Sequence, residues 1–343
     1  MWQFFILLVL VVVVYLPLGG LFARLLALPN LSSLVFELFR DPSLLKALQF
    51  TYRQAFISAV ISLLVGLPGA YFFSHYEFKG KKLLRNLTMI PFILPSILVV
   101  LAMIIYYGQQ GFFARTFNTK TFLYSFSGIV LAHVFYNFSL SIRIVGSTWE
   151  KLNLRLKESA YVLGDSPLKT FFRVELPLLW PAIAYATLLA FLYSSLSFAV
   201  VLVFGGISFS TLEVYIYTLV RRLDLKKAHL VAFIQLIISF FFISVVSFLA
   251  KRTEAVDKAF STFQAKPLRS EKRWWIKSLL FLYFAFLFLL FGGPLLALLV
   301  RSFQNRDGIF TLANYLNLFS PKVERILGLP IWQVFLNSLL LAA

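Results

Sequence analysis

The sequence contains no cysteine, so its 343 residues form no disulfides and supply neither a thiolate nucleophile nor a cysteine ligand for a metal. Histidine is nearly as scarce, and His75, His133 and His229 are too scattered to predict a metal site. The motif G-x-x-x-x-G-K-S/T is absent, which excludes an ATP-binding loop of that kind. No carboxylate pair or nucleophile constellation is visible. We therefore predict neither an enzyme nor a bound cofactor.

Charged residues make up only 13% of the chain, whereas 60% of it is hydrophobic. Long apolar runs with this composition are typical of an integral membrane protein. The net charge of +18 does not indicate nucleic-acid binding, because Lys and Arg gather at the ends of the apolar runs, as membrane topology requires. We predict an all-α, multi-pass membrane protein that contacts lipid and binds no nucleic acid.

Seven apolar runs are long enough to cross a bilayer, which takes about 20 residues. The first is expected to be an anchor, since no positive charge precedes it as in a signal peptide. The third carries Pro91 and Pro95, which should kink or unwind it. The segment 31–49 is expected to lie outside the membrane, at the interface. The predicted spans are 4–28, 50–73, 87–107, 127–146, 180–204, 228–250 and 276–300.

A polar segment at 150–177 separates two of these spans. Gly164 is suited to end a helix in the left-handed conformation, and Ser166-Pro167 has the N-cap and first-turn proline of a second helix. One apolar face is predicted at Leu152, Leu156, Ala160 and Leu163, and a second at Leu168, Phe172 and Leu176. The pattern predicts a helix-turn-helix outside the bilayer that docks to another protein. An amphipathic loop resting on lipid headgroups is the alternative.

The spacing in this segment resembles the EAA signature, E-A-A-x3-G-x9-I-x-L-P, of importer permeases of the ATP-binding-cassette (ABC) class. Serine at the second position and valine in place of isoleucine are mild departures. In that family the loop is the coupling element and sits in a groove of the cytoplasmic ATPase subunit. Glu158 is expected to hold the first helix in register at that site, and Lys157 to face solvent. The resemblance assigns coupling to Glu158, Ser159, Ala160, Gly164, Asp165, Val174, Leu176 and Pro177.

This resemblance implies the type I ABC importer permease fold in the cell (inner or plasma) membrane. It also implies two cytoplasmic ABC ATPase subunits and an extracytoplasmic solute-binding protein as partners. ATP would be hydrolysed by the partner subunits rather than by this chain. A secondary carrier or channel not driven by ATP is the alternative, although no acidic residue falls clearly at mid-span, where such proteins usually carry one.

An internal repeat is suggested by two similar stretches. Pro17 and Pro294 are each followed seven residues later by an arginine, and segment 50–55 resembles segment 337–342. Chance similarity between apolar sequences is the alternative. We predict a first six-span unit at 1–275 and the start of a second, incomplete unit at 276–343, in a sequence truncated at its C-terminus.

Two further features bear on the solute. Gly205-Gly206 followed by Thr211–Tyr217 resembles a stretch of fused, two-unit permeases for thiamine and, less closely, iron(III); a turn before an interfacial helix is the alternative. Thiamine, then iron(III), is therefore the expected solute. Polar residues within the spans either line the pathway or only bond and pack helices together. The candidates for the pathway are His133, Asn137, Ser194 and Ser197.

Overall fold

The computed structural model describes residues 8–9, 11–16, 19–20, 22–23, 30–118, 122–152, 154–206, 209–259, 265–305 and 307–342. The chain divides into two compact units. Unit 1 comprises residues 1–100 and 122–284, and unit 2 comprises residues 101–121 and 285–343. Most of the expected first span, 4–28, lies outside the described residues. The described part of it contains the short helix η1 (Val11–Tyr15).

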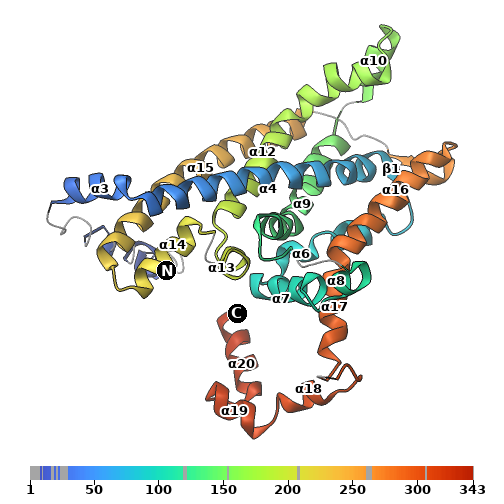
Figure 1. Cartoon of the computed structure of the whole chain (residues 1–343). Coiled ribbons are helices and arrows are strands. Elements are labelled where there is room, and N and C mark those ends of the chain that lie inside the picture. The colour runs from blue at the N-terminus through green and yellow to red at the C-terminus, as the bar shows by residue number, and fades with distance from the viewer. Residues whose placement is uncertain are drawn as a thin grey trace. The chain divides into compact units, whose positions relative to one another are not determined.

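Four long helices form the body of unit 1. Helix α4 packs against α9 and α12, which also pack against each other, and α15 packs against α12 (Figure 1). Their bounds are α4 Pro42–His75, α9 Phe126–Glu150, α12 Leu176–Ser195 and α15 Leu225–Ala259. The buried side of α4 is made of small residues such as Ala55, Ser58 and Ala59, which let neighbouring helices approach closely. At Gly66 the approach is so close that a Cβ atom would lie 2.5 Å from the carbonyl oxygen of Phe138 in α9.

The third expected span is interrupted as its prolines predict. Helix α5 (Lys81–Leu87) is followed by α6 (Ile90–Ile93), and α7 (Ser96–Tyr107) begins only after a break. Leu94 is extended at ψ 140°, because the ring of the following Pro95 disfavours the helical conformation for the residue before it. Helix α7 passes from unit 1 into unit 2.

Two short helices, α3 (Leu31–Arg40) and α14 (Leu212–Arg221), pack against α4, and a third, α13 (Ala199–Phe204), packs against α9. The segment 31–49, which is predicted to lie at the interface, contains α3 and the first turns of α4, which begins at Pro42. The Asp41 carboxylate accepts a hydrogen bond from the Ser43 amide at 2.8 Å, and this N-cap with proline at the first helical position moves the start of the helix ahead of the apolar run.

At the other end of α4 the chain forms a two-residue parallel ladder. Strand β1 (Tyr76–Glu77) pairs with β2 (Lys266–Pro267), which leads through the short helix η3 (Leu268–Ser270) to α16 (Trp274–Leu287). Tyr76 and Ile276 are buried together beside this ladder. The two strands therefore join the end of α4 to the start of α16.

Unit 2 contains the last part of the chain. Helix α16 continues through η4 (Phe288–Gly292) into α17 (Gly293–Ser302), and the Tyr107 hydroxyl donates a 2.9 Å hydrogen bond to the carbonyl of Leu290. The remaining helices are α8 Phe112–Phe117, α18 Ala313–Asn317, α19 Pro321–Leu327 and α20 Ile331–Ala342.

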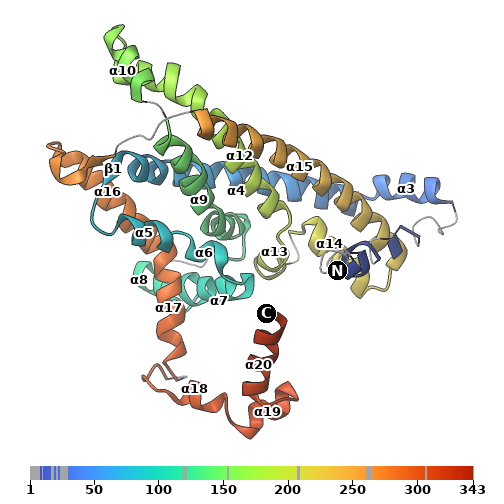
Figure 2. The same ribbon diagram turned by 180° about the vertical axis from the view of Figure 1, so that it is seen from behind.

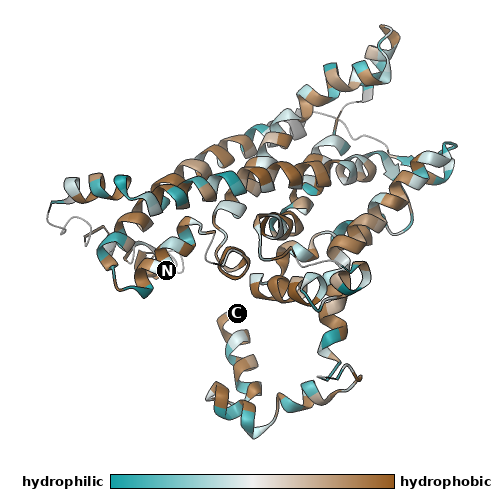
Figure 3. Ribbon diagram, viewed as in Figure 1, coloured by the Kyte–Doolittle hydropathy of each residue, from teal (hydrophilic) through white to brown (hydrophobic). Residues whose placement is uncertain are grey.

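Six helical segments of the described chain are long and apolar enough to cross a membrane. Figure 3 shows that hydrophobic residues dominate these helices. Their bounds are Pro42–His75, Ser96–Phe117, Phe126–Glu150, Pro167–Ser195, Leu225–Thr253 and Trp274–Ser302. The expected all-α membrane fold is confirmed, and four of the observed helices extend beyond the predicted spans because polar end turns are absent from a hydropathy-based boundary. The span predicted at 180–204 is wrong at its end, because α12 ends at Ser195 and α13 is a separate helix.

Candidate functional site

The segment between α9 and α12 forms the predicted helix-turn-helix. It consists of α10 (Leu154–Val162), α11 (Pro167–Thr170) and η2 (Phe171–Glu175). Gly164 has φ +89°, and the amides of Gly164 and Asp165 donate 3.0 Å hydrogen bonds to the carbonyls of Tyr161 and Ala160. This is the paired C-terminal bonding of a helix that ends at a left-handed residue. The Ser166 hydroxyl then accepts the amide of Lys169, which starts the second helix. We call residues 150–177 the coupling element, after the role that the resemblance to the EAA signature predicts.

The far end of the coupling element exposes large apolar side chains. Val162 and Leu163 are 87% and 86% exposed, and Leu168 and Phe172 are 71% and 57% exposed. In Figures 1 and 2 this turn lies at one extremity of unit 1. The predicted face of Leu152, Leu156, Ala160 and Leu163 is only partly correct. Leu152 and Ala160 are buried, whereas Leu156 is exposed and Leu163 lies in the turn after α10 ends at Val162. This apolar surface is suited to contact with another protein.

On its inner side the coupling element is fixed to the helices by one buried carboxylate. Glu175 is only 6% exposed. Its oxygens accept a 2.9 Å hydrogen bond from the indole N–H of Trp149 in α9 and lie 2.6 Å from the ammonium of Lys157 in α10. The expectation that Lys157 faces solvent is therefore wrong, because its side chain turns inward to pair with this carboxylate. The only sequence signal for Glu175 was an acidic residue at the start of an apolar run.

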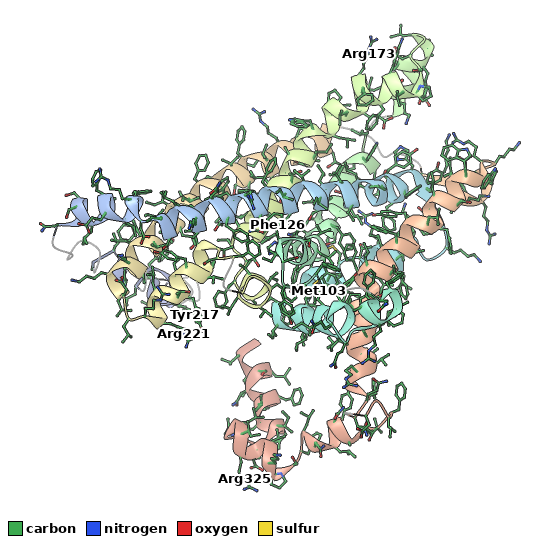
Figure 4. All side chains as sticks on the ribbon, in the orientation of Figure 1. Met103, Phe126, Arg173, Tyr217, Arg221 and Arg325 are labelled. Carbon is green, nitrogen blue, oxygen red and sulfur yellow. The ribbon has the colours of Figure 1, made fainter. Side chains whose placement is uncertain are left out.

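The residues assigned by resemblance to the EAA signature occupy different environments. Glu158 and Ser159 are exposed, and Glu158 forms no ion pair within the described part of the chain. Asp165 lies 3.4 Å from Arg173, which Figure 4 shows at the outer end of the element. Of the remaining signature residues, Ala160 is buried, Val174 and Leu176 are half-buried, and Gly164 and Pro177 are exposed.

A second ionic group holds the C-terminal end of α9, at Glu150. The Arg85 guanidinium donates to both oxygens of Glu150 at 3.0 Å, and the ammonium of Lys81 lies 3.7 Å from the same carboxylate. The basic turn after α4 is thus tied to the helix that leads directly into the coupling element.

A cavity of about 400 Å³ lies within unit 1 and collects most of the predicted pathway residues. His133, Asn137 and Ser197 line it, whereas Ser194 stands behind Asn137 and is 3.0 Å from its amide nitrogen. Gln54 of α4 donates to the Ser194 carbonyl at 2.8 Å. The full lining is Phe92, Ser96, His133, Tyr136, Asn137, Tyr193, Leu196, Ser197, Phe198, Ala199 and Val200.

This cavity carries polar atoms that have no protein partner. In the described part of the chain, His133 Nε2, Tyr136 Oη and Asn137 Oδ1 make no hydrogen bond although they are buried. Four aromatic rings also line it, and none of its lining side chains bears a formal charge at neutral pH when histidine is neutral. Buried polar atoms without partners are costly unless water or a ligand satisfies them. Tyr136 is not among the pathway residues predicted from the sequence, and the structure adds it to the lining of the cavity.

The stretch that resembles thiamine and iron(III) permeases lies at the end of unit 1 opposite the coupling element, where Figure 4 labels Tyr217 and Arg221. The Leu212 amide donates to Thr51 of α4 at 2.9 Å, and Glu213 accepts a 2.6 Å hydrogen bond from Gln235 of α15. Burial raises the pKa of Glu213 above its ordinary value. The stretch therefore fixes α14 against two long helices.

Asp41 holds the same end together. Its carboxylate accepts a 3.1 Å hydrogen bond from the Tyr215 hydroxyl. Burial opposes ionisation of Asp41, but hydrogen bonds from Ser43 and Tyr215 outweigh it and hold the pKa of Asp41 below its usual value. Among the described residues, no group of three or more His, Asp or Glu side chains gathers to hold a metal ion.

Comparison with known proteins gives three consistent similarities. The family model described as "binding-protein-dependent transport system inner membrane component" matches residues 59–260. The probable sulfate transport system permease protein cysT of Prototheca wickerhamii is 30% identical over 237 residues, which cover 68% of this chain and 92% of that protein. The thiamine transport system permease protein ThiP of Haemophilus influenzae is 29% identical over 277 residues, which cover 78% of this chain and 50% of that protein.

Solved structures show the same fold. A bacterial alginate ABC transporter, crystallised in complex with an alginate pentasaccharide-bound periplasmic protein, contains a chain that superimposes with a TM-score of 0.56 at 15% identity. The superposition covers 76% of this chain and 96% of that one. At this identity the similarity concerns the fold alone.

Proposed function

This chain belongs to the family of binding-protein-dependent transport system inner membrane components, and we propose that its coupling element transmits the movement of a partner ATPase to the solute pathway. The chain is a multi-pass permease subunit of an ABC importer, and ATP hydrolysis is the task of other subunits. The observation that carries the proposal is an exposed apolar turn joined to a buried ion pair. A turn that only rested on lipid headgroups would not need that rigid connection.

The connection gives the element a path for force. Displacement of α10 by a partner pulls on Lys157, whose ammonium is held by Glu175 at the start of α12. Glu175 is also bonded to Trp149 at the end of α9, so α9 and α12 move with it. Packed helices shift between discrete arrangements rather than deforming continuously, which converts this displacement into opening or closing of the bundle.

The partners follow from this arrangement. We assign two cytoplasmic ABC ATPase subunits to the side of the coupling element. An extracytoplasmic solute-binding protein would dock at the opposite end, around α3 and α14.

We also assign residues 1–275 to a first permease unit and 276–343 to the start of a second. The similarity to ThiP extends over 78% of this chain but only half of that protein, which supports a two-unit arrangement.

The cavity around His133 and Asn137 is assigned to the pathway, and its chemistry favours thiamine as the solute. Its volume of about 400 Å³ lies in the range of sites for small organic ligands, roughly 300–1,000 Å³. The rings of Phe92, Tyr136 and Tyr193 suit an aromatic cation, which is attracted to ring faces. The unpartnered Asn137 and His133 atoms supply hydrogen-bonding groups for such a solute.

Sulfate is the second candidate, and iron(III) the third. Sulfate is favoured by the names of several similar permeases, including that of Prototheca wickerhamii. The cavity lining contains no Lys or Arg to compensate a dianion and no Asp or Glu to bind a trivalent metal ion. Recognition of either ion would have to take place mainly in the separate binding protein.

The test is reconstitution of the native complex in liposomes with its ATPase and binding protein. We expect ATP-dependent uptake of thiamine, and stimulation of ATP hydrolysis by thiamine-loaded binding protein. Stimulation by sulfate-loaded or iron-loaded protein alone would replace the solute assignment without affecting the coupling proposal. Uptake that persists without ATPase subunits and follows an ion gradient would contradict the coupling proposal itself.

A further inference from the structure

A cleft in unit 1 lies where two membrane-spanning helices end, and the proposed function makes no use of it. The ladder between β1 and β2 brings the residues after α4 beside those before α16 (Figure 1). The cleft between them has a volume of about 670 Å³. We call it the interfacial cleft, and its lining residues are Glu77, Phe78, Lys79, Pro267, Leu268, Arg269 and Lys277.

The charge of the interfacial cleft is strongly positive. Three of its seven lining residues are the cations Lys79, Arg269 and Lys277, and none of them forms an ion pair within the described residues. The only acid in the lining, Glu77, is bound to Lys81 at 2.8 Å. Within the described residues, no carboxylate therefore lies within ion-pairing distance of these three cations.

The position of the cleft combines this charge with an apolar boundary. Helix α4 ends at His75 and α16 begins at Trp274, so the cleft lies between the ends of two helical segments that are long and apolar enough to cross a membrane. Trp274 is 76% exposed, and tryptophan is enriched at membrane interfaces. Phe78 and Leu268 add apolar wall to the cleft.

We propose that the interfacial cleft binds an anionic phospholipid, with its phosphate group among Lys79, Arg269 and Lys277 and its acyl chains along the membrane-facing surface below. Basic pockets at the ends of transmembrane helices bind acidic headgroups in this way. The site lies on the side of the coupling element, because Lys81 bridges Glu77 and Glu150, the last residue of α9. The bound lipid would fix the α4 and α16 ends at the side where the ATPase acts.

Native mass spectrometry of the full chain in detergent tests the site with phosphatidylglycerol and phosphatidylcholine as probes. The wild-type protein should retain phosphatidylglycerol in preference to phosphatidylcholine. The triple variant Lys79→Gln/Arg269→Gln/Lys277→Gln should bind phosphatidylglycerol about 100-fold more weakly, since each cation near an anionic lipid contributes a factor of about five. The matched control Arg221→Gln/Arg222→Gln/Lys226→Gln, at the opposite end of unit 1, should bind within about twofold of wild type.

Three outcomes would overturn the proposal. Equal weakening in both triple variants would show that binding follows overall charge rather than the cleft. Equal retention of the two lipids would show that the headgroup is not recognised. Competition by inorganic phosphate at the same concentration as the lipid would identify a site for free anions. If the cleft variant does not fold, Lys277→Gln alone replaces it, with an expected loss of about fivefold.

Discussion

At the scale of single residues, the turn of the coupling element depends on the backbone of Gly164 rather than on space around it. Its φ of +89° is readily accessible only to glycine. Space is not the limit, because a Cβ atom built there meets no atom of this chain within 4 Å. Within this chain, a substitution is therefore limited by its backbone preference rather than by space. This separates strain in the turn from steric clash, which makes the position a clean test of shape.

Gly164→Val should abolish stimulation of ATP hydrolysis by loaded binding protein while leaving membrane insertion intact. A β-branched residue at positive φ is a conformational outlier, and the left-handed region costs roughly 1–2 kcal/mol for residues with a Cβ. Gly164→Asn is the control, because asparagine enters this region more readily. ATPase assays on purified complexes at equal concentration measure the effect, and normal coupling in the valine variant would rule out a shape-dependent contact.

Glu175→Gln should weaken both coupling and stability, since it leaves Lys157 without its buried partner. Breaking a buried pair costs about 3–5 kcal/mol in general, and we expect less here because the Lys157 side chain remains 25% exposed. The double variant Lys157→Gln/Glu175→Gln removes both charges and should recover the thermal unfolding temperature but not ATPase stimulation. The control Lys169→Gln changes an exposed cation of the same element.

The two readouts separate the roles of this pair. If the double variant recovers stimulation together with stability, the ion pair only holds the fold and carries no coupling. Loss of stimulation with ATPase subunits still bound assigns the defect to transmission, whereas loss of the subunits on purification assigns it to docking.

At the scale of elements, the contact between α4 and α9 is set by small residues. Gly66 faces Phe138 and Ser141 so closely that a Cβ would lie 2.5 Å and 2.6 Å from their atoms. The atoms met there include backbone, which does not move aside as the end of a flexible side chain does. The absence of a side chain at Gly66 therefore allows α4 and α9 to approach this closely.

Gly66→Leu should separate α4 from α9 and lower the yield of folded, monodisperse protein. Overfilling a packed interface costs about 1–3 kcal/mol, and more where backbone must shift. Leu64→Ala is the control on the same helix, because Leu64 is 61% exposed within this chain. Size-exclusion chromatography of detergent-solubilised protein measures the result; a wild-type profile for the leucine variant would show that the helices are not held this closely.

At the scale of the whole molecule, the coupling element and the cavity occupy separate parts of unit 1 and are connected through α9 and α12. Trp149 and Asn137 lie on the same helix, α9, near the coupling element and the cavity respectively. A defect at one place should therefore be distinguishable from a defect at the other. Substitutions in the cavity test solute passage, while those in the coupling element test transmission.

Tyr136→Phe removes one of the unpartnered polar atoms of the cavity and keeps the ring. We expect thiamine uptake in the reconstituted complex to fall by about threefold to tenfold, the effect of losing one net hydrogen bond of about 1 kcal/mol. Basal ATP hydrolysis should be unchanged. The control Tyr193→Phe changes another ring of the lining. Unchanged uptake for the Tyr136 variant would remove this hydroxyl from the proposed pathway.

The sequence by itself determined the class of protein, the helical spans and the helix-turn-helix at 150–177, because apolar run length, glycine at a helix end and Ser-Pro at a helix start are local properties. The start of α4 at Pro42 is set by the N-cap at Asp41 rather than by the beginning of the apolar run. Only the tertiary structure decided that Lys157 turns inward to Glu175 and that the ladder between residues 76–77 and 266–267 forms the interfacial cleft. Such contacts join residues that are distant along the chain or on opposite sides of a turn, and helical periodicity carries no information about which partner a charged side chain finds there.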